Sequence, residues 1–319
     1  MSTQSPLPVP CAWLPCVWRL CAMLAITMSG CQWLQRRTHL EPTPILFQQP
    51  PTLEQLLTAV NGNTERVSTL KSRDARLVIK GVPASISLDL AYEQPRRLRL
   101  RAGTVITGQE LDLGSNDELF WFWAKQNPQP ALLFARHDQF ARSPSRNLLP
   151  IEPLWIIDAM GLPRFDPAHR HEGPLARGNG LLEIRSHIPG PDGESTKLTL
   201  IDQQYAWVMQ QQVFDPRGRL LASAQASEHE FFPQARVALP RKVAIELATA
   251  QLAFTVETVS YSLNFPVDES FTLPRDQFPN VPLVDLADPG LAPGPTTQSS
   301  NLPPNYPTSS ETPRVRGLR

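Results

Sequence analysis

Short segments with apolar residues at every second position follow one another through most of this chain. Residues 75–79, 86–92 and 98–100 are the first three, and Asp-Pro and Gly in "FDPRGRL" predict a tight turn between two later ones. Such alternation is typical of strands with one buried face, because successive side chains point to opposite faces. No crossover helix of the βαβ kind separates the segments, so antiparallel pairing is predicted.

The strand pattern predicts the fold class. We expect about ten or eleven strands in one sheet, and an open sheet of that length has to curl or split. The predicted fold is therefore α+β, with a single curved antiparallel sheet that forms an incomplete β-barrel. The other strands are predicted at 105–113, 118–123, 180–187, 196–202, 207–215, 219–228, 243–247 and 251–263.

Three segments have helical rather than strand periodicity. Thr52 and Gln55 have the spacing of a capping box before apolar residues at helical intervals, which predicts an N-terminal amphipathic helix that resumes over 63–70. In the middle of the chain, "PALLFARHDQFAR" and "LLPIEPLWIIDAMGL" carry apolar residues at helical spacing between prolines, with Gly161 as a stop. We interpret these two as helices inserted in the sheet.

The cysteines indicate how the chain is processed. They are Cys11, Cys16, Cys21 and Cys31. Arg19 precedes a short apolar run, in the order of a secretory signal, and the run is too short to span a bilayer. It ends in "MSGC", which resembles a bacterial lipobox. We predict that residues 1–30 are a lipoprotein signal peptide and that Cys31 is lipidated; the alternative is an ordinary signal peptide or short anchor with Cys31 unmodified.

The rest of the chain divides by composition. Residues 31–51 are polar and broken by proline, which predicts a tether, and 52–286 form the folded domain. Residues 287–319 are rich in Pro, Ser and Thr and are predicted to be disordered. One acyl chain anchors only marginally, but a diacylglyceryl group with an N-acyl chain is sufficient. Gln32 stands where Asp would signal inner-membrane retention, which favours the outer membrane, facing the periplasm.

Charge and motifs exclude several classes of function. The thirty Lys and Arg residues balance thirty Asp and Glu residues, so no net charge favours nucleic acid. No nucleophile elbow or phosphate-binding loop is present, so we expect neither an enzyme nor a cofactor. His169 and His171, with Asp166 and Glu172, could hold a metal, but in a loop rich in Pro and Gly they indicate a solvated connection, and we predict no metal site.

Three motifs resemble those of the LolA/LolB lipoprotein-carrier superfamily. They are "YEQPRRLRLRAG" from Tyr92, "LGSNDELFWFWAKQNP" with its turn at 115–117, and the hairpin "QQQVFDPRGRLLASAQA". Their order and spacing, over roughly residues 53–285, carry the resemblance. The chain departs from the family in a longer middle helical insert and a longer "DPAHRHEGPLARGNG" loop. It also has several arginines, Arg96, Arg97, Arg99 and Arg101, in the matching strand rather than one that could lock the lid.

The resemblance implies a half-barrel whose helices cover an apolar cavity that receives acyl chains. Burial in such a cavity stabilises by about 0.8 kcal/mol per CH₂. Trp121 and Trp123 are placed in this lining, although Phe120 and Phe122 are the alternative pair because sequence fixes register poorly. Packing of a sheet against a helix would give the same alternation. The other predicted cavity residues are Ile86, Leu88, Leu90, Leu98 and Leu100, and the predicted lid residues are Leu132, Leu133, Phe134, Trp155, Ile156 and Ile157.

Three functions are compatible with this sequence. The first is an anchored protein that binds lipid or lipoprotein acyl chains in lipoprotein sorting or insertion, with the membrane bound through Cys31 and a periplasmic carrier protein as a candidate partner. The second is an envelope sensor or interaction lipoprotein that uses the same fold to bind a protein, through its proline-rich tail. A structural lipoprotein with a vestigial fold is a third reading.

Overall fold

The computed structural model describes residues 43–80, 85–127, 130–140, 142–143, 155–248 and 252–288. The predicted signal peptide, Cys31 and the tail beyond residue 288 lie outside the described residues. Within this part of the chain, no helix is both long enough and apolar enough to cross a bilayer.

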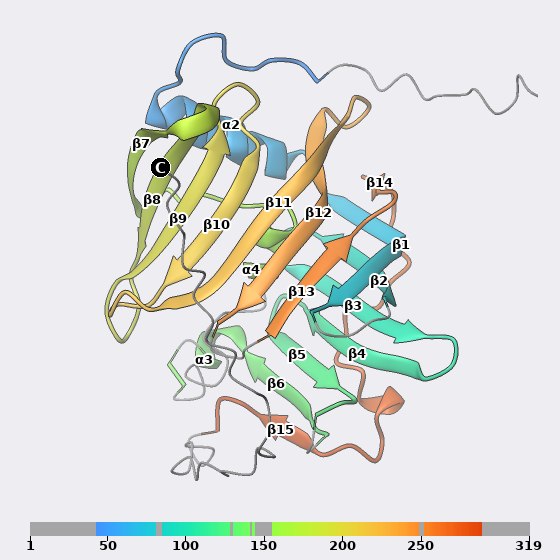
Figure 1. Ribbon diagram of the computed structural model, residues 1–319. Helices are drawn as coiled ribbons and strands as arrows, with labels where there is room; N and C mark the ends of the chain where they lie inside the picture. The colour runs from blue at the N-terminus through green and yellow to red at the C-terminus, as the bar shows by residue number, and fades with distance from the viewer. Residues whose placement is uncertain are drawn as a thin grey trace, which may run out of the picture.

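One 15-stranded sheet contains all the described strands (Figure 1). Its order is β15-β6-β5-β4-β3-β2-β1-β13-β12-β11-β10-β9-β8-β7, with β14 paired to β1 beside this path. The strands are β1 Thr69–Ile79, β2 Ile86–Glu93, β3 Arg97–Thr104, β4 Gly108–Ser115, β5 Leu119–Ala124, β6 Leu132–Arg136, β7 Arg170–Arg177, β8 Leu181–Ile188, β9 Ser195–Asp202, β10 Val208–Phe214, β11 Leu220–Phe232, β12 Val237–Leu247, β13 Leu252–Glu257, β14 Ser262–Leu263 and β15 Leu283–Asp285.

The sheet consists of two meanders, β1–β6 and β7–β13, which we call the first and second halves. They join where β1 pairs with β13, for example Leu77 with Val256. Figure 1 shows the sheet curving so that the second half lies in front of the first. The path ends at β7 and β15, and the barrel stays open. The predicted α+β fold with one curved, incomplete barrel is confirmed.

The strand count and one pairing differ from the prediction. Strands β6, β7 and β15 add to the predicted set, and the strand predicted over 251–263 is divided into β13 and β14. Strand β15 pairs with β6 in parallel. The edge strand β7 is exposed along most of its length and therefore has no apolar alternation by which sequence could reveal it.

Strand β6 replaces a predicted helix. Its two faces are both covered, because Leu132 packs against Trp121 on one side and Leu133 packs near Phe120 on the other. A strand buried on both faces has a continuous apolar run, which periodicity alone does not separate from a helix. The predicted helix over "PALLFARHDQFAR" is therefore wrong, and only α3, His137–Phe140, follows the strand.

The N-terminal helix forms as predicted and then stops. Helix α2, Leu53–Glu65, begins with the capping box of Thr52 and Gln55. It packs through Leu56 and Val60 against the ends of β8–β10. The expected continuation to residue 70 is wrong, since β1 begins at Thr69. The described end of the predicted tether packs here too, with Phe47 against the same cluster.

Helix α4, Trp155–Ala159, lies between the two halves of the sheet (Figure 1). Gly161 ends it as predicted, with φ at 97°. A Cβ at this position would meet Pro240 Cδ at 2.3 Å, so glycine is required both for the turn and for the close approach to β12. Short 3₁₀ turns complete the helical structure at Gly178–Gly180 and Arg275–Gln277.

A segment after the last antiparallel strands, residues 264–288, crosses the first half of the sheet and ends in β15. We call it the C-terminal strap. Its Phe278 packs 4.5 Å from Trp123, measured between ring centroids. We call the face beneath the strap the outer face, and the face that packs on α4 the inner face. The sequence did not predict the strap, because its contacts join residues about 170 positions apart, such as Arg99 and Ser270.

Candidate functional site

Apolar side chains from four neighbouring strands form a continuous row on the inner face. Leu90 lies opposite Leu100, Leu100 opposite Leu113, and Leu113 opposite Phe122. Residues directly opposite each other on antiparallel strands point to the same face. The predicted cavity residues on this face are Ile86, Leu88, Leu90, Leu98 and Leu100.

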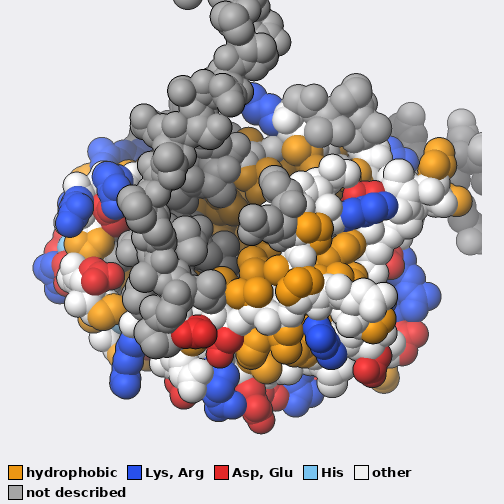
Figure 2. Space-filling view, turned by 90° about the horizontal axis from the view of Figure 1, so that it is seen from below, with side chains coloured by type: hydrophobic (Ala, Val, Ile, Leu, Met, Phe, Trp, Pro, Cys, Tyr) orange, Lys and Arg blue, Asp and Glu red, His pale blue; other side chains and the backbone are white. Residues whose placement is uncertain are grey.

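This row is covered in the structure. Leu88, Leu90 and Leu98 are 2% exposed or less, and Leu100 is 8% exposed. They share one cluster with α4 and with the inner side chains of β11–β13. The halves of the sheet thus close on each other through a helix of five residues. Figure 2 shows the molecule from below. Hydrophobic side chains gather in the middle of the surface seen from that side, where it is hollowed.

The predicted placement of Trp121 and Trp123 is wrong. Trp121 lies opposite Gly114, one position out of phase with the leucine row, so both indoles face outward and Phe120 and Phe122 face inward. Trp121 is fully buried under the strap with Leu132 and Phe278. Sequence left this register open, and the aromatic residues on both faces of β5 are buried, so composition could not decide it.

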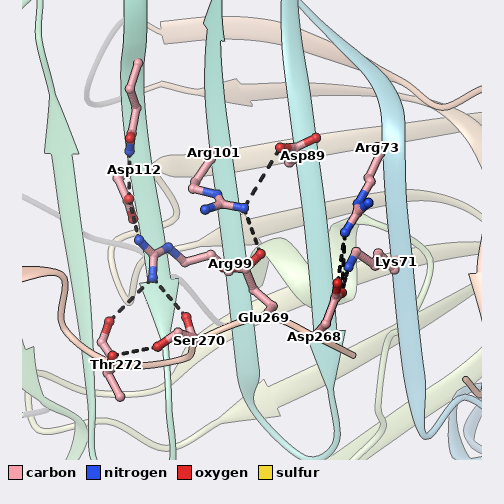
Figure 3. A network of polar contacts seen from close by, with 11 residues as sticks. Lys71, Arg73, Asp89, Arg99, Arg101, Asp112, Asp268, Glu269, Ser270 and Thr272 are labelled. Atoms are coloured by element: carbon pink, nitrogen blue, oxygen red, sulfur yellow. Dashed lines mark hydrogen bonds and ion pairs between the residues drawn. The ribbon is translucent and has the colours of Figure 1, made fainter. Parts of the chain in front are cut away.

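A buried ion pair between Arg99 and Asp112 lies on the outer face (Figure 3). Arg99 Nη2 donates to Asp112 Oδ2 at 2.6 Å, and Trp121 Nε1 donates to Asp112 Oδ1 at 2.8 Å. Arg99 Nη1 also donates to the carbonyl oxygens of Ser270 and Thr272 in the strap, at 2.9 and 3.4 Å. Charge-assisted hydrogen bonds of this kind are the strong ones. They attach the strap to the sheet.

Further charges along the strap repeat this attachment nearer the solvent. Arg101 donates to Glu269 at 2.7 Å, and Arg73 pairs with Asp268 at 3.1 Å, where Lys71 also makes contact (Figure 3). Arg99 and Arg101 of "RRLRLR" therefore bind the strap, whereas Arg97 pairs with Glu93 and Asp117. No local pattern in the sequence indicates this role. The structure does not make any of these arginines a contact of α4.

A polar patch interrupts the inner face in the second half of the sheet. It consists of Lys197 and Thr199 on β9, Gln211 on β10, and Asp158 on α4. Lys197 Nζ donates to Asp158 Oδ2 at 2.5 Å, and Gln211 Nε2 donates to the Asp158 carbonyl oxygen at 2.8 Å. Lys197, Thr199 and Gln211 are 7%, 0% and 2% exposed. Sequence reasoning missed this patch, although a lysine at an inward position of an alternating strand was a signal for it.

The predicted lid is corrected in part. Leu132, Leu133 and Phe134 belong to strand β6, so they do not form a helix over the sheet. Trp155 and Ile157 do cover the inner face from α4, where they are 8% and 7% exposed, and Ile156 packs against the same cluster. Only α4 therefore has the position that the lid was expected to have.

The tip of the β3–β4 hairpin carries two fully exposed apolar residues. The relative solvent-accessible surface areas of Val105 and Ile106 are 105% and 95%. The sequence placed them inside a strand over 105–113, but β3 ends at Thr104 and β4 begins at Gly108. Adjacent exposed β-branched residues at a protruding tip are a feature of surfaces that meet an apolar partner.

A small pocket of about 70 Å³ lies between α2 and the ends of β10–β12. Tyr205 stacks on Trp207 at 4.6 Å, and Trp207 stacks on His229 at 4.9 Å, between ring centroids. Burial lowers the pKa of His229 to about 4, against a smaller opposing effect of a backbone hydrogen bond at Val208. His229 is therefore neutral at pH 7, which suits its stacked position.

His171 of the "DPAHRHE" segment has structural side-chain contacts. His171 Nδ1 lies 2.8 Å from Ser186 Oγ, and its Nε2 lies 2.8 Å from the carbonyl oxygen of Asp166. Across the described residues, no group of three or more His, Cys, Asp or Glu side chains is arranged to hold a metal ion.

The fold defined by this geometry is an open, curved, antiparallel half-barrel with a short helix inside it. No protein-family profile matches the chain, and no curated protein is significantly similar in sequence. Solved structures with related shapes are a LolA superfamily protein from Nitrosomonas europaea, at 12% identity and a TM-score of 0.44, and a domain assigned to outer membrane lipoprotein sorting from Vibrio parahaemolyticus, at 9% and 0.48.

A third related shape is a DUF1329 family protein from Desulfovibrio piger, at 10% identity and a TM-score of 0.43. The three matches cover 70%, 71% and 68% of this chain and 98%, 99% and 95% of the respective structures. At these scores the likeness concerns shape, and no activity of this chain follows from it.

Proposed function

We propose that this chain is a lipid-anchored envelope protein that binds lipid or lipoprotein acyl chains between the two halves of its sheet. The observation that carries the proposal is the leucine row continued to Phe122, which is covered by the short helix α4 together with inner side chains of β11–β13, and not by a long helix. An acyl chain that replaced α4 would be stabilised by about 0.8 kcal/mol per CH₂. Binding of this kind requires no nucleophile and no cofactor.

In this proposal the ends of the chain supply the location. Residues 1–30 direct export, Cys31 carries the acyl groups, and 31–51 tether the domain to the outer membrane on its periplasmic side. Val105 and Ile106 at the β3–β4 tip would then contact the bilayer or an apolar partner, and a periplasmic carrier protein would present the ligand. The role would be lipoprotein sorting or insertion.

A fluorescent acyl ester tests the proposal directly. We expect saturable binding to the full chain carrying Cys31→Ser, and we expect Ile86→Phe, which adds bulk at the partly buried start of the leucine row, to weaken it several-fold. Ser87→Phe is the matched control, since Ser87 is exposed on the opposite face of the same strand. Equal effects of the two substitutions, or no saturable binding, would contradict acyl binding on the inner face.

Depletion of the protein in its native cell tests the biological role. Other lipoproteins are expected to accumulate at the wrong membrane if the chain acts in sorting. If membrane fractionation showed an unchanged distribution of every lipoprotein examined, the role in sorting would be contradicted, whether or not the protein binds acyl chains.

A second function is favoured by one observation. The leucine row is closed in this structure, with Leu88 and Leu90 each 2% exposed, which suits a sensor or interaction lipoprotein that binds a protein partner with its outer surface. That reading predicts that the acyl ester does not bind at all and that α4 stays in place.

A further inference from the structure

The polar patch on the inner face is incomplete as a structural element. Thr199 Oγ1 and Gln211 Oε1 are buried without a hydrogen-bond partner in the described part of the chain. Buried polar groups in native proteins are nearly always paired, because an unpaired group forfeits its hydrogen bonds to water. The Thr199 hydroxyl on β9, which faces Gln211 on β10, can donate a hydrogen bond, so it points to a ligand that supplies an acceptor, and not only to packing.

The Asp158 carboxylate of the protein itself occupies the position next to these groups. The Asp158 carboxylate accepts from Lys197 Nζ, and the Asp158 carbonyl oxygen accepts from Gln211 Nε2. Both contacts come from one residue of α4. If α4 moves away, the ammonium group of Lys197, the amide of Gln211 and the hydroxyl of Thr199 remain together on the sheet with a net positive charge and several donors.

Apolar residues border the patch on two sides, while Ser186, which contacts His171, lies opposite Lys197. Thr199 lies opposite Ile184, and Gln211 lies opposite Ala224. Ala224 and its neighbour Ile245 on β12 belong to the same cluster as the leucine row. A ligand whose charged end reached Lys197 could therefore lay an aliphatic chain along the inner face without leaving apolar contact.

We propose that Lys197, Thr199 and Gln211 form a subsite for the anionic oxygen headgroup of an amphiphile, a carboxylate or a phosphate, and that Asp158 occupies this subsite while α4 is closed. This inference rests on the proposed function and adds the headgroup to it. The Asp158 carboxylate therefore competes with the ligand: when the ligand binds, its anionic headgroup takes the place of this carboxylate beside Lys197. Tyr92 belongs to the same inner-face cluster, and burial raises the pKa of its hydroxyl to about 12, with smaller Coulombic effects of Arg164 and Asp158.

The test compares two probes that differ only in charge. The full chain with Cys31→Ser is titrated with 11-(dansylamino)undecanoic acid and with its neutral methyl ester. We expect the acid to bind about tenfold more tightly, as a charged hydrogen-bonded contact implies. Lys197→Met should remove this difference and leave ester binding in place. Lys242→Met is the matched control, because Lys242 pairs with Glu257 on β13 away from the patch.

Two further variants keep the test decisive if Lys197→Met does not fold. Thr199→Val, which has nearly the same shape, should weaken acid binding several-fold and spare the ester. Asp158→Asn should strengthen binding of both probes, and of the acid more. An increase for the ester alone would contradict competition between Asp158 and the ligand's anion.

Displacement of the bound acid identifies the source of the anion. Oleate or oleoyl lysophosphatidate should each compete, and the stronger competitor shows whether carboxylate or phosphate is preferred. If inorganic phosphate competed as strongly as these amphiphiles, the aliphatic chain would contribute nothing to binding, and the proposal of an amphiphile ligand would be overturned. Equal affinity for acid and ester would refute the subsite and leave acyl binding intact, whereas binding of neither probe would refute the proposed function together with the subsite.

Discussion

Two ion pairs, a buried one on the outer face of the sheet and a partly buried one on the inner face, differ in how many of the neighbouring polar groups have hydrogen-bond partners. On the outer face both oxygens of Asp112 accept, from Arg99 and Gln109 on one side and from Trp121 on the other, and Arg99 reaches two strap carbonyls although its Nε has no partner among the described residues. On the inner face, the Lys197–Asp158 pair stands beside two unpaired groups.

The difference separates a permanent contact from an exchangeable one. Removing one partner of a fully desolvated pair leaves an uncompensated charge that has no route to water. The pair on the inner face joins a rigid strand to a helix of five residues, and the Asp158 side chain is 25% exposed. Water or a ligand can therefore replace Asp158 at a lower cost. The following substitutions test this contrast.

Asp112→Ala should have the largest effect. It leaves the Arg99 guanidinium and the Trp121 N–H buried without their acceptor, and we expect a loss of about 3–5 kcal/mol in the free energy of unfolding. Urea denaturation followed by tryptophan fluorescence measures it. Glu118→Ala, whose ion pair with Arg136 is solvent-exposed, is the control and should change stability by less than about 1 kcal/mol.

Mild acid should destabilise the aromatic stack under α2. The folded-state pKa of His229 is lowered to about 4, so the unfolded chain binds the extra proton first as the pH falls. Stability is therefore full above the ordinary histidine pKa and falls between about pH 6.5 and 4, by up to about 3 kcal/mol. His229→Gln should remove this part of the pH dependence in thermal melts. An unchanged slope in the variant would assign the acid sensitivity to other groups.

Gly114→Ala should disturb the outer face without touching a charge. A Cβ there would lie 2.0 Å from Trp121 Cζ2, and the ring is fully buried. We expect a loss of about 2 kcal/mol from overpacking, together with a shifted Trp121 environment in near-ultraviolet circular dichroism. Gly178→Ala is the control, because nothing lies within 4 Å of its added Cβ.

Asp158→Asn should have the smallest effect on global stability, about 1 kcal/mol, because Lys197 can gain water as α4 loosens. Hydrogen exchange should instead show faster exchange confined to residues 155–162. A loss as large as that of Asp112→Ala would mean that both pairs are structural and would remove the distinction drawn between them.

Sequence predicted the fold where one face of a strand is buried. The alternation in β2 and β3 identified both strands and their inner residues, and the Asp215 turn identified the β10–β11 hairpin, where Asp215 accepts from the backbone of Arg217 and Arg219. Prediction failed for β6, which is covered on both faces, and for β7, which is exposed on both. In each case the period of two is absent from the sequence although the strand is present.

The amino-acid sequence by itself determined which residues of each alternating strand are apolar, that the chain forms one curved antiparallel sheet, and where the first helix and its cap begin, because these depend on neighbours within a few positions. The tertiary structure decided which aromatic pair of β5 faces inward, what covers each face, and that Lys197 meets Asp158. Those facts depend on pairing register and on contacts between segments that are distant in the sequence. The free energies of such contacts are set by desolvation in the assembled fold, so they produce no periodic pattern in the local sequence.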